Sequence, residues 1–268
     1  MRPLTFLAGL TAGAWLIHER RARQHAVRFA AAALESLLKA IDANDQQTGA
    51  HVRRVATYAL IIADALDVDE EERRSIELAA LFHDIGKIHE ALFDIVHEPR
   101  QLTPEERRAV ATHPTRGAQV LAPIAHFHRE LAEAVLAHHE RWDGTGYPRG
   151  LRAGRIPLAA RVVSLADSFD AMTHNRRYRH GQTTREAIAN IARGRGTQFD
   201  PLLVDLVTLP PVFDALSQAH RESWRGRTQP NRRDARGVAD GPNVSFRWRS
   251  RSEPPISVRE KMADTRDA

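Results

Sequence analysis

Apolar residues recur every three or four positions through most of this chain, which is the repeat of a helix with one buried face. The pattern predicts helices over residues 19–44, from about His51 onward, and from Asp69 to His83. Further helices are expected over residues 131–139 and 156–172, and they are also expected to begin near positions 103, 114, 183 and 201. No stretch alternates apolar and polar residues as a half-buried strand does. The sequence therefore predicts an all-α fold.

Several of these helices have a recognisable start signal. Thr103 is followed by Pro104 at the first helical position and by Glu106 three residues after the cap. That combination is a capping box, in which two side chains satisfy backbone N–H groups at the helix start. Asp69 and Thr183 begin similar patterns. These residues are predicted to be helix N-caps.

Composition divides the chain into three parts. Its 268 residues, 42% hydrophobic and 27% charged, suffice for one large globular domain with tails. We expect that domain at residues 37–210, after an N-terminal apolar segment and helix at residues 1–36. Residues 217–268 are rich in Arg, Pro, Gly, Asp and Ser without periodicity, so a disordered tail is predicted there. The pI of about 10.1 favours anionic partners, but much of the excess Arg lies in this tail, so no specific nucleic acid is expected.

The N-terminal apolar run at residues 3–17 leaves three interpretations open: a secretory signal, a spanning helix, and a helix packed on the domain. It meets the signal-peptide pattern only weakly, and it is shorter than the roughly 20 residues that span a bilayer. We expect a cytoplasmic protein with residues 3–17 as a candidate inner-membrane anchor. The helix over residues 19–44 either pairs with a second copy in a homodimer or covers the core.

The candidate chemistry centres on His83 and Asp84. His83 continues the apolar face of Ile76, Ala79 and Ala80, so its imidazole is expected to be buried. A buried ionisable pair is costly unless hydrogen bonds or a cation compensate it. A hydrogen-bonded core pair and a metal site both satisfy this requirement. Because the chain has no Cys, any metal must be held by imidazole and carboxylate, which suit Fe, Mn, Ni, Co or Zn.

The rest of the chain favours the metal site. Seven candidate ligands lie on or beside five predicted helices: His51, His83, Asp84, His113, His138, His139 and Asp167. This number of N and O donors fits two metal ions better than one, and paired ions promote in-line displacement at phosphorus. Phosphoester hydrolysis is the reaction class implied. Lys87, one turn beyond Asp84, is a candidate to neutralise a phosphate oxygen, and the alternative is an exposed helix-end lysine.

Several long motifs in order resemble the HD-GYP family. They are the segments His83-Asp84-Ile85-Gly86-Lys87, His139-Glu140-Arg141-Trp142-Asp143-Gly144-Thr145-Gly146-Tyr147-Pro148 and Asp167-Ser168-Phe169-Asp170-Ala171-Met172-Thr173, with Thr48-Gly49-Ala50-His51 and Gly196-Thr197-Gln198-Phe199-Asp200-Pro201. The likeness covers roughly residues 37–209. It implies an HD-type helical bundle with a glycine-rich GYP loop. It also implies a bimetallic phosphodiesterase that hydrolyses cyclic di-GMP to pGpG and on to GMP.

The resemblance also implies roles for single residues. The seven candidate ligands match the family's metal ligands, with Asp84 as the bridging carboxylate, and Asp84 and Lys87 are the catalytic candidates. Lys87, Arg176, Arg179 and Tyr147 are the candidates for substrate contact. Two divalent ions are expected, Fe or Mn ahead of Ni, Co or Zn. The loop around Tyr147 is the expected contact for diguanylate cyclase-type partners.

The chain departs from the family pattern in three places. Residues 89–101 lack the usual continuation of the His-Asp motif, and Arg177 replaces a common Pro. Gln47 occupies a position where some members have a Glu that binds a third metal. Two alternative functions therefore stay open: hydrolysis of another nucleotide, and a weakly active module that binds cyclic di-GMP or a partner.

Overall fold

The computed structural model of this chain describes residues 30–40, 43, 46–88, 103–124, 128, 130–174 and 180–228. Across these residues every element is helical, and the single β-type pairing is an isolated bridge between Arg195 and Phe199. The prediction of an all-α fold is confirmed. The segments 3–17 and 89–101, and Arg176, Arg177 and Arg179, lie outside the described residues, so the predictions made for them stay predictions. In the described part of the chain, no helix taken singly has the length and apolar character needed to cross a membrane.

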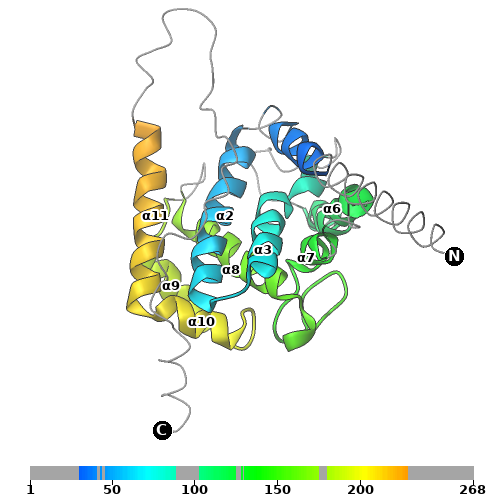
Figure 1. Ribbon diagram of the computed structural model, residues 1–268. Helices are drawn as coiled ribbons and strands as arrows, with labels where there is room; N and C mark the ends of the chain where they lie inside the picture. The colour runs from blue at the N-terminus through cyan, green and yellow to red at the C-terminus, as the bar shows by residue number, and fades with distance from the viewer. Residues whose placement is uncertain are drawn as a thin grey trace, which may run out of the picture.

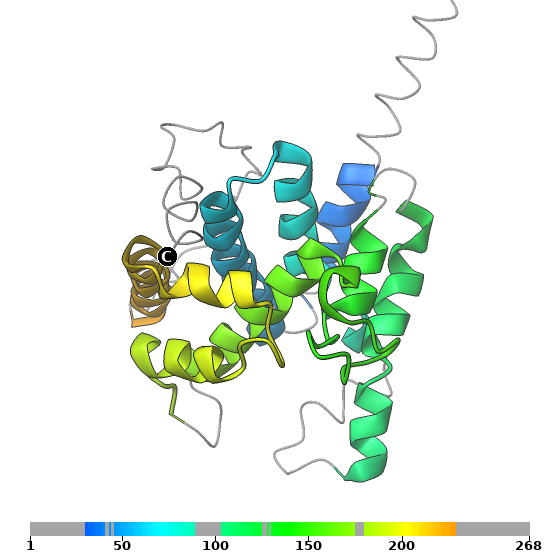
Figure 2. The same ribbon diagram turned by 90° about the horizontal axis from the view of Figure 1, so that it is seen from below.

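Three helices form the centre of the domain: α2 (Gln46–Leu66), α3 (Glu70–Phe82) and α8 (Leu158–Thr173), which pack against one another. On one side lie α6 (His113–Leu121) and α7 (Leu131–Ala137), and on the other α9 (Thr184–Arg193), α10 (Pro201–Thr208) and α11 (Pro210–Thr228), as Figures 1 and 2 show. The remaining short elements are α5 (Pro104–Val110), η1 (Ile85–Ile88), η2 (Ala122–Ile124) and η3 (Ala153–Arg155).

The core lies between the central helices and is closed by large side chains. The rings of Tyr58 on α2 and Phe169 on α8 meet edge to face with their centroids 4.9 Å apart. Residues 30–40 are helical, and Ala30 and Leu34 are buried, with Leu34 in the core cluster. In this segment the apolar face therefore covers the core, which is the second of the two interpretations of the predicted N-terminal helix.

The predicted helix starts at Asp69, Thr103 and Thr183 are confirmed. Asp69 accepts a hydrogen bond from the N–H of Glu72, and the other two caps form complete capping boxes. The predicted start of α2, near His51, lies too far along the chain. The helix begins at Gln46, so His51 lies in its second turn. Gly49 lies inside this helix without ending it. A Gly inside a helix costs only about 1 kcal/mol, and Gly49 is buried in the packed domain.

The predicted start of a disordered tail at residue 217 is wrong, because α11 continues to Thr228. Leu216 and Ser217 are buried, and Ala219 packs against the core. The helix lies against α2, α9 and α10, so tertiary contacts stabilise a stretch whose composition alone gives little helical signal. Residues 229–268 lie outside the described part of the chain.

The turn after α3 packs tightly on the first turn of α6 through Gly86. A Cβ atom at Gly86 would lie 2.1 Å from the carbonyl oxygen of His113 and 2.7 Å from the backbone nitrogen of Gly117. Only glycine permits this approach of two backbones. The contact fixes Asp84 and Lys87, on either side of Gly86, against His113.

Gly86→Ala should therefore destabilise the metal-free protein by about 1–3 kcal/mol, the usual cost of overpacking. Gly154→Ala is the matched control, because a Cβ atom there would meet nothing within 4 Å. Urea unfolding followed by circular dichroism measures both variants. Equal stability of Gly86→Ala and the wild type would show that the two backbones are free to move apart.

Candidate metal centre

The seven candidate ligands are brought together from five helices. His83 and His138 are the C-caps of α3 and α7, and His113 is the first residue of α6. His51 projects from the second turn of α2, and Asp167 projects from α8. The remaining two, Asp84 and His139, directly follow the C-caps. The structure thus gathers at one place side chains that are up to 116 positions apart in the sequence.

The donors form two groups. His113, His138 and His139 each present one ligand atom within 4.8 Å of the others, and His51, His83 and Asp167 do the same. Each group has the size and the donor types of a site for one divalent ion.

Asp84 lies between the two groups. Its Oδ1 is 3.4 Å from Nε2 of His113, which belongs to the first group. Its Oδ2 is 3.5 Å from Nε2 of His83 and 3.9 Å from Nε2 of His51, which belong to the second. One oxygen faces each group, which is the arrangement that a carboxylate bridging two cations needs.

Backbone hydrogen bonds fix the tautomers of three imidazoles. Nδ1 of His83, His113 and His138 lies 2.9, 2.7 and 2.6 Å from the carbonyl oxygens of residues 80, 110 and 135. Because a carbonyl can only accept, each Nδ1 carries a proton, which leaves Nε2 as the ring nitrogen that faces the site. Nε2 of His113 and Nε2 of His138 are only 3.2 Å apart. Two lone pairs at this distance repel unless a cation lies beside them.

A proton is not that cation at neutral pH. Burial lowers the pKa of His113 to about 3 and that of His139 to about 4, and it also holds the pKa of His138 well below its usual value. Burial alone would raise the pKa of Asp84, but the ammonium group of Lys87 is the largest opposing effect, and this pKa lies well below the usual range. The imidazoles of His113, His138 and His139 are therefore neutral beside an ionised carboxylate, which is the protonation state that metal binding requires.

Two buried atoms in the centre test whether a metal fits. Nε2 of His83 and Oδ1 of Asp84 are buried and make no hydrogen bond within the described residues. Leaving such atoms unsatisfied costs roughly 1–3 kcal/mol each. Divalent metal ions at the two groups would engage both atoms, so the residues present fit such ions.

The centre is open to solvent on one side. The side chains of His51, Asp167 and Lys87 are 20%, 25% and 28% exposed, whereas His83 is 1% exposed. Nζ of Lys87 donates to Oδ2 of Asp84 over 2.8 Å. A ligand approaching from this side would meet the ammonium group of Lys87 and the ligand atoms together.

The predicted GYP loop covers another edge of the centre. The ring of Tyr147 stacks on His139 with the centroids 4.9 Å apart, and the N–H of Tyr147 lies 3.3 Å from the carbonyl oxygen of His139. A Cβ atom at Gly146 would lie 2.3 Å from the backbone nitrogen of Arg141, so glycine is needed for the loop to fold back. Buried Glu140 accepts the N–H groups of residues 149 and 151 and fixes the end of the loop.

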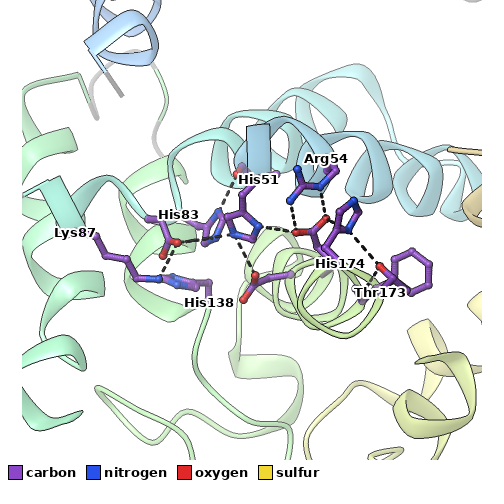
Figure 3. A network of polar contacts seen from close by, with 12 residues as sticks. His51, Arg54, His83, Lys87, His138, Thr173 and His174 are labelled. Atoms are coloured by element: carbon purple, nitrogen blue, oxygen red, sulfur yellow. Dashed lines mark hydrogen bonds and ion pairs between the residues drawn. The ribbon is translucent and has the colours of Figure 1, made fainter. Parts of the chain in front are cut away.

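Three residues beside the centre, Asp170, Arg54 and His174, have no role predicted from the sequence. Asp170 accepts a hydrogen bond of 2.7 Å from Nδ1 of His51 and is itself bound by Arg54 and His174. Figure 3 follows these contacts from Lys87 and His83 through His51 to Arg54 and His174. The available signal was spacing: on α2 and on α8, a candidate ligand is followed three residues later by a charged residue on the same face.

Comparisons with known proteins agree with these observations. The family model described as HD domain matches residues 35–203. The cyclic di-GMP phosphodiesterase response regulator RpfG of Xanthomonas campestris pv. campestris is 41% identical over 174 residues, which are 64% of this chain and 46% of that protein. The 3'3'-cGAMP-specific phosphodiesterase 2 of Vibrio cholerae is 34% identical, over 64% of this chain and 33% of that protein. The chain thus spans less than half the length of these curated relatives.

Two solved structures share the fold. The cyclic GMP-AMP-specific phosphodiesterase V-cGAP3 of V. cholerae aligns with a TM-score of 0.52 and 22% identity, over 72% of this chain and 52% of that chain. Bd1817, an HDG"Y"P protein from Bdellovibrio bacteriovorus, aligns with a TM-score of 0.53 and 20% identity, over 73% and 64% of the two chains. At this identity the likeness concerns the fold, and it confirms the predicted HD-type architecture.

The buried neutral imidazoles make stability depend on pH in a defined direction. In the unfolded chain His113 and His139 bind protons near pH 6.5, whereas in the folded protein their pKa values are about 3 and about 4. Between pH 6.5 and 4 the unfolded state binds more protons than the folded state. The free energy of unfolding should therefore decrease as the pH is lowered through this range. The raised pKa of His51 acts oppositely: its stabilising contribution is complete below pH 6.5 and is lost as the pH rises through its folded value. The lowered pKa of Asp84 contributes stability that persists above about pH 4.

Urea unfolding of EDTA-treated protein at pH 7 and pH 5 measures the effect. The wild type should be less stable at pH 5. His113→Gln, which removes one of the titrating rings, should show a smaller difference. Equal stability of the wild type at the two pH values would contradict the burial of neutral imidazoles.

Proposed function

This chain belongs to the HD domain family, and on that premise we propose that it is a metal-dependent phosphodiesterase that hydrolyses cyclic di-GMP to pGpG and further to GMP. Such an activity would lower the level of this second messenger in bacterial signalling. The observation that carries the proposal is the position of Asp84, whose two oxygens face two separate groups of nitrogen and oxygen donors. Relatives named cyclic di-GMP phosphodiesterase, at 36–41% identity, support the substrate class.

Two divalent ions are proposed for the centre, with Asp84 shared between them. One would be held by His113, His138 and His139, and the other by His51, His83 and Asp167. Fe or Mn is proposed ahead of Ni, Co or Zn, because imidazole and carboxylate without thiolate suit these metals. When bound, the ions supply a water of lowered pKa and stabilise negative charge on the attacking and leaving oxygens of a phosphodiester.

The residues around the ions have separate tasks in this proposal. The backbone carbonyls that bind Nδ1 of three histidines keep each Nε2 aimed into the centre before substrate arrives, which reduces the reorganisation needed for the reaction. Lys87 lies at the open side, where its ammonium group would neutralise a phosphate oxygen as charge develops there. Tyr147 is proposed to contact substrate from the loop that stacks on His139. Arg176 and Arg179 are proposed to bind phosphate or guanine, as the family resemblance implies.

A second candidate substrate is another cyclic dinucleotide. Relatives named 3'3'-cGAMP-specific phosphodiesterase are 34–38% identical to this chain, a range that overlaps the identity of the relatives named for cyclic di-GMP. A weakly active binding module is the third possibility, and the complete set of ligands argues against it. Contacts with diguanylate cyclases through the loop, homodimer formation and membrane contact stay predictions from the sequence.

A product assay on protein loaded with Mn²⁺ or Fe²⁺ separates the three candidates. We expect turnover of cyclic di-GMP to pGpG, and Asp84→Ala should lose both metal and hydrolysis because the shared carboxylate is gone. Turnover of 3'3'-cGAMP alone would establish the second candidate. Binding of cyclic di-GMP without turnover, at full metal content, would establish the third.

Lys87→Ala should keep the wild-type metal content and lower kcat roughly 10²–10³-fold, the usual effect of removing one group that stabilises developing negative charge. The alternative is that Lys87 only stabilises the helix end. Metal analysis together with steady-state kinetics decides between them, with Lys39→Ala as the control because Lys39 forms an exposed i,i+4 ion pair with Glu35. An unchanged kcat in Lys87→Ala would assign the residue to the helix end.

A further inference from the structure

A second polar cluster lies directly behind His51, the one residue that it shares with the seven candidate ligands. Its centre is Asp170 on α8, which is 2% exposed. Around it are His51 and Arg54 from α2 and His174 at the end of α8. The cluster therefore ties two of the three central helices together at the edge of the candidate metal centre (Figure 3).

The carboxylate of Asp170 has all of its acceptor positions in use. Oδ1 receives Nε of Arg54 over 2.7 Å and faces Nδ1 of His174 at 3.0 Å. Oδ2 receives Nη2 of Arg54 over 2.9 Å and the Nδ1–H of His51 over 2.7 Å. A carboxylate offers about four lone-pair sites, so four N–H groups hold it in one place and one orientation. The bidentate pairing with Arg54 adds geometric precision, because two parallel bonds leave the carboxylate no freedom to rotate.

This fixed carboxylate determines how His51 faces the metal centre. Since Asp170 can only accept, Nδ1 of His51 carries a proton, and Nε2 is the ring nitrogen left to bind a metal. Nε2 lies 3.4 Å from Oδ1 of Asp167 and 3.9 Å from Oδ2 of Asp84. His51 differs here from His83, His113 and His138, whose Nδ1 atoms bind backbone carbonyls three residues earlier in the chain. His51 lies within α2, where the carbonyls are already used by the helix, so a side chain must supply the acceptor.

The cluster extends to α11 through His174. Its Nε2 lies 3.2 Å from Oγ of Ser223, and Ser223 in turn donates to the carbonyl oxygen of His220 over 2.7 Å. His174 is 5% exposed, so its ring is fixed between Asp170 and the last helix of the domain.

We infer that Asp170, held by Arg54 and His174, is a positioning residue that orients His51 for the ion bound by His51, His83 and Asp167. The inference rests on the proposed metal-dependent function and deepens it. Partners of this kind, which hold a ligating histidine through its second nitrogen, typically change metal affinity 10–100-fold when they are removed. The effect belongs to one of the two metal sites, because Asp170 contacts no member of the group His113, His138 and His139 among the contacts that the structure describes.

Titration of the metal-free protein with Mn²⁺, followed by calorimetry, tests the inference without relying on activity. The wild type should bind two ions per chain. Asp170→Ala should bind one with unchanged affinity and the other 10–100-fold more weakly. His51→Ala identifies the affected site, because it removes a ligand from the same group. Asp205→Ala is the matched control: Asp205 also forms a bidentate pair with an arginine, Arg195, but at an exposed position on α10.

Two results would overturn the inference. Wild-type affinity at both sites in Asp170→Ala would show that His51 orients itself without Asp170. Equal weakening at both sites would show that Asp170 acts only through the stability of the fold. If thermal melting shows that Asp170→Ala is unfolded, His174→Ala replaces it, since it removes one of the four donors. A weakening confined to the same site, by a smaller factor, is then expected, and unchanged or uniform affinity would overturn the inference.

The test also separates this inference from the proposed function. A wild type that binds two Mn²⁺ ions and hydrolyses no cyclic dinucleotide would contradict the proposed function and leave the role of Asp170 to be decided by the titration. A wild type that hydrolyses cyclic di-GMP, with an Asp170→Ala variant that binds metal normally, would contradict the role of Asp170 alone.

Discussion

A buried carboxylate surrounded by lone pairs is the constraint on which this centre depends. Asp84 is ionised and 7% exposed, and the Nε2 atoms that face it belong to imidazoles, several of which burial keeps neutral. Lys87 compensates one oxygen, but the other has no hydrogen-bond partner within the described residues. Such an arrangement is costly in a protein interior unless cations accompany it. The fold holds these groups together because the helices that carry them pack elsewhere through apolar faces.

The ends of helices supply both the geometry and part of the electrostatics. α3 and α7 both end at the centre, with His83 and His138 as C-caps. The C-terminus of a helix carries partial negative charge and favours a cation. A C-cap residue also has free backbone carbonyls one turn behind it, and these accept the Nδ1–H groups and fix the tautomers. Where a ligand lies inside a helix, as His51 does, that acceptor is missing, and Asp170 takes its place.

The sequence predicted most of the helices and the identity of the gathered side chains, but it did not predict the contacts that support them. His83 was predicted to be buried because it continues the apolar repeat of α3, and it is 1% exposed. The role of Asp170 was not predicted: its spacing places it on the same face of α8 as Asp167, but nothing in the sequence distinguishes a supporting carboxylate from a ligand. The extent of α11 was missed for a similar reason: its helical state depends on packing against α2, α9 and α10, which composition does not record.

The central claim is that Asp84 lies between two cations. The most direct test is crystallography of Mn²⁺-loaded protein, with anomalous scattering to place the ions. Two anomalous peaks about 3.5–4 Å apart are expected, with one oxygen of Asp84 bound to each ion. A single peak at one group of histidines, or two peaks with Asp84 bound to neither, would contradict this claim.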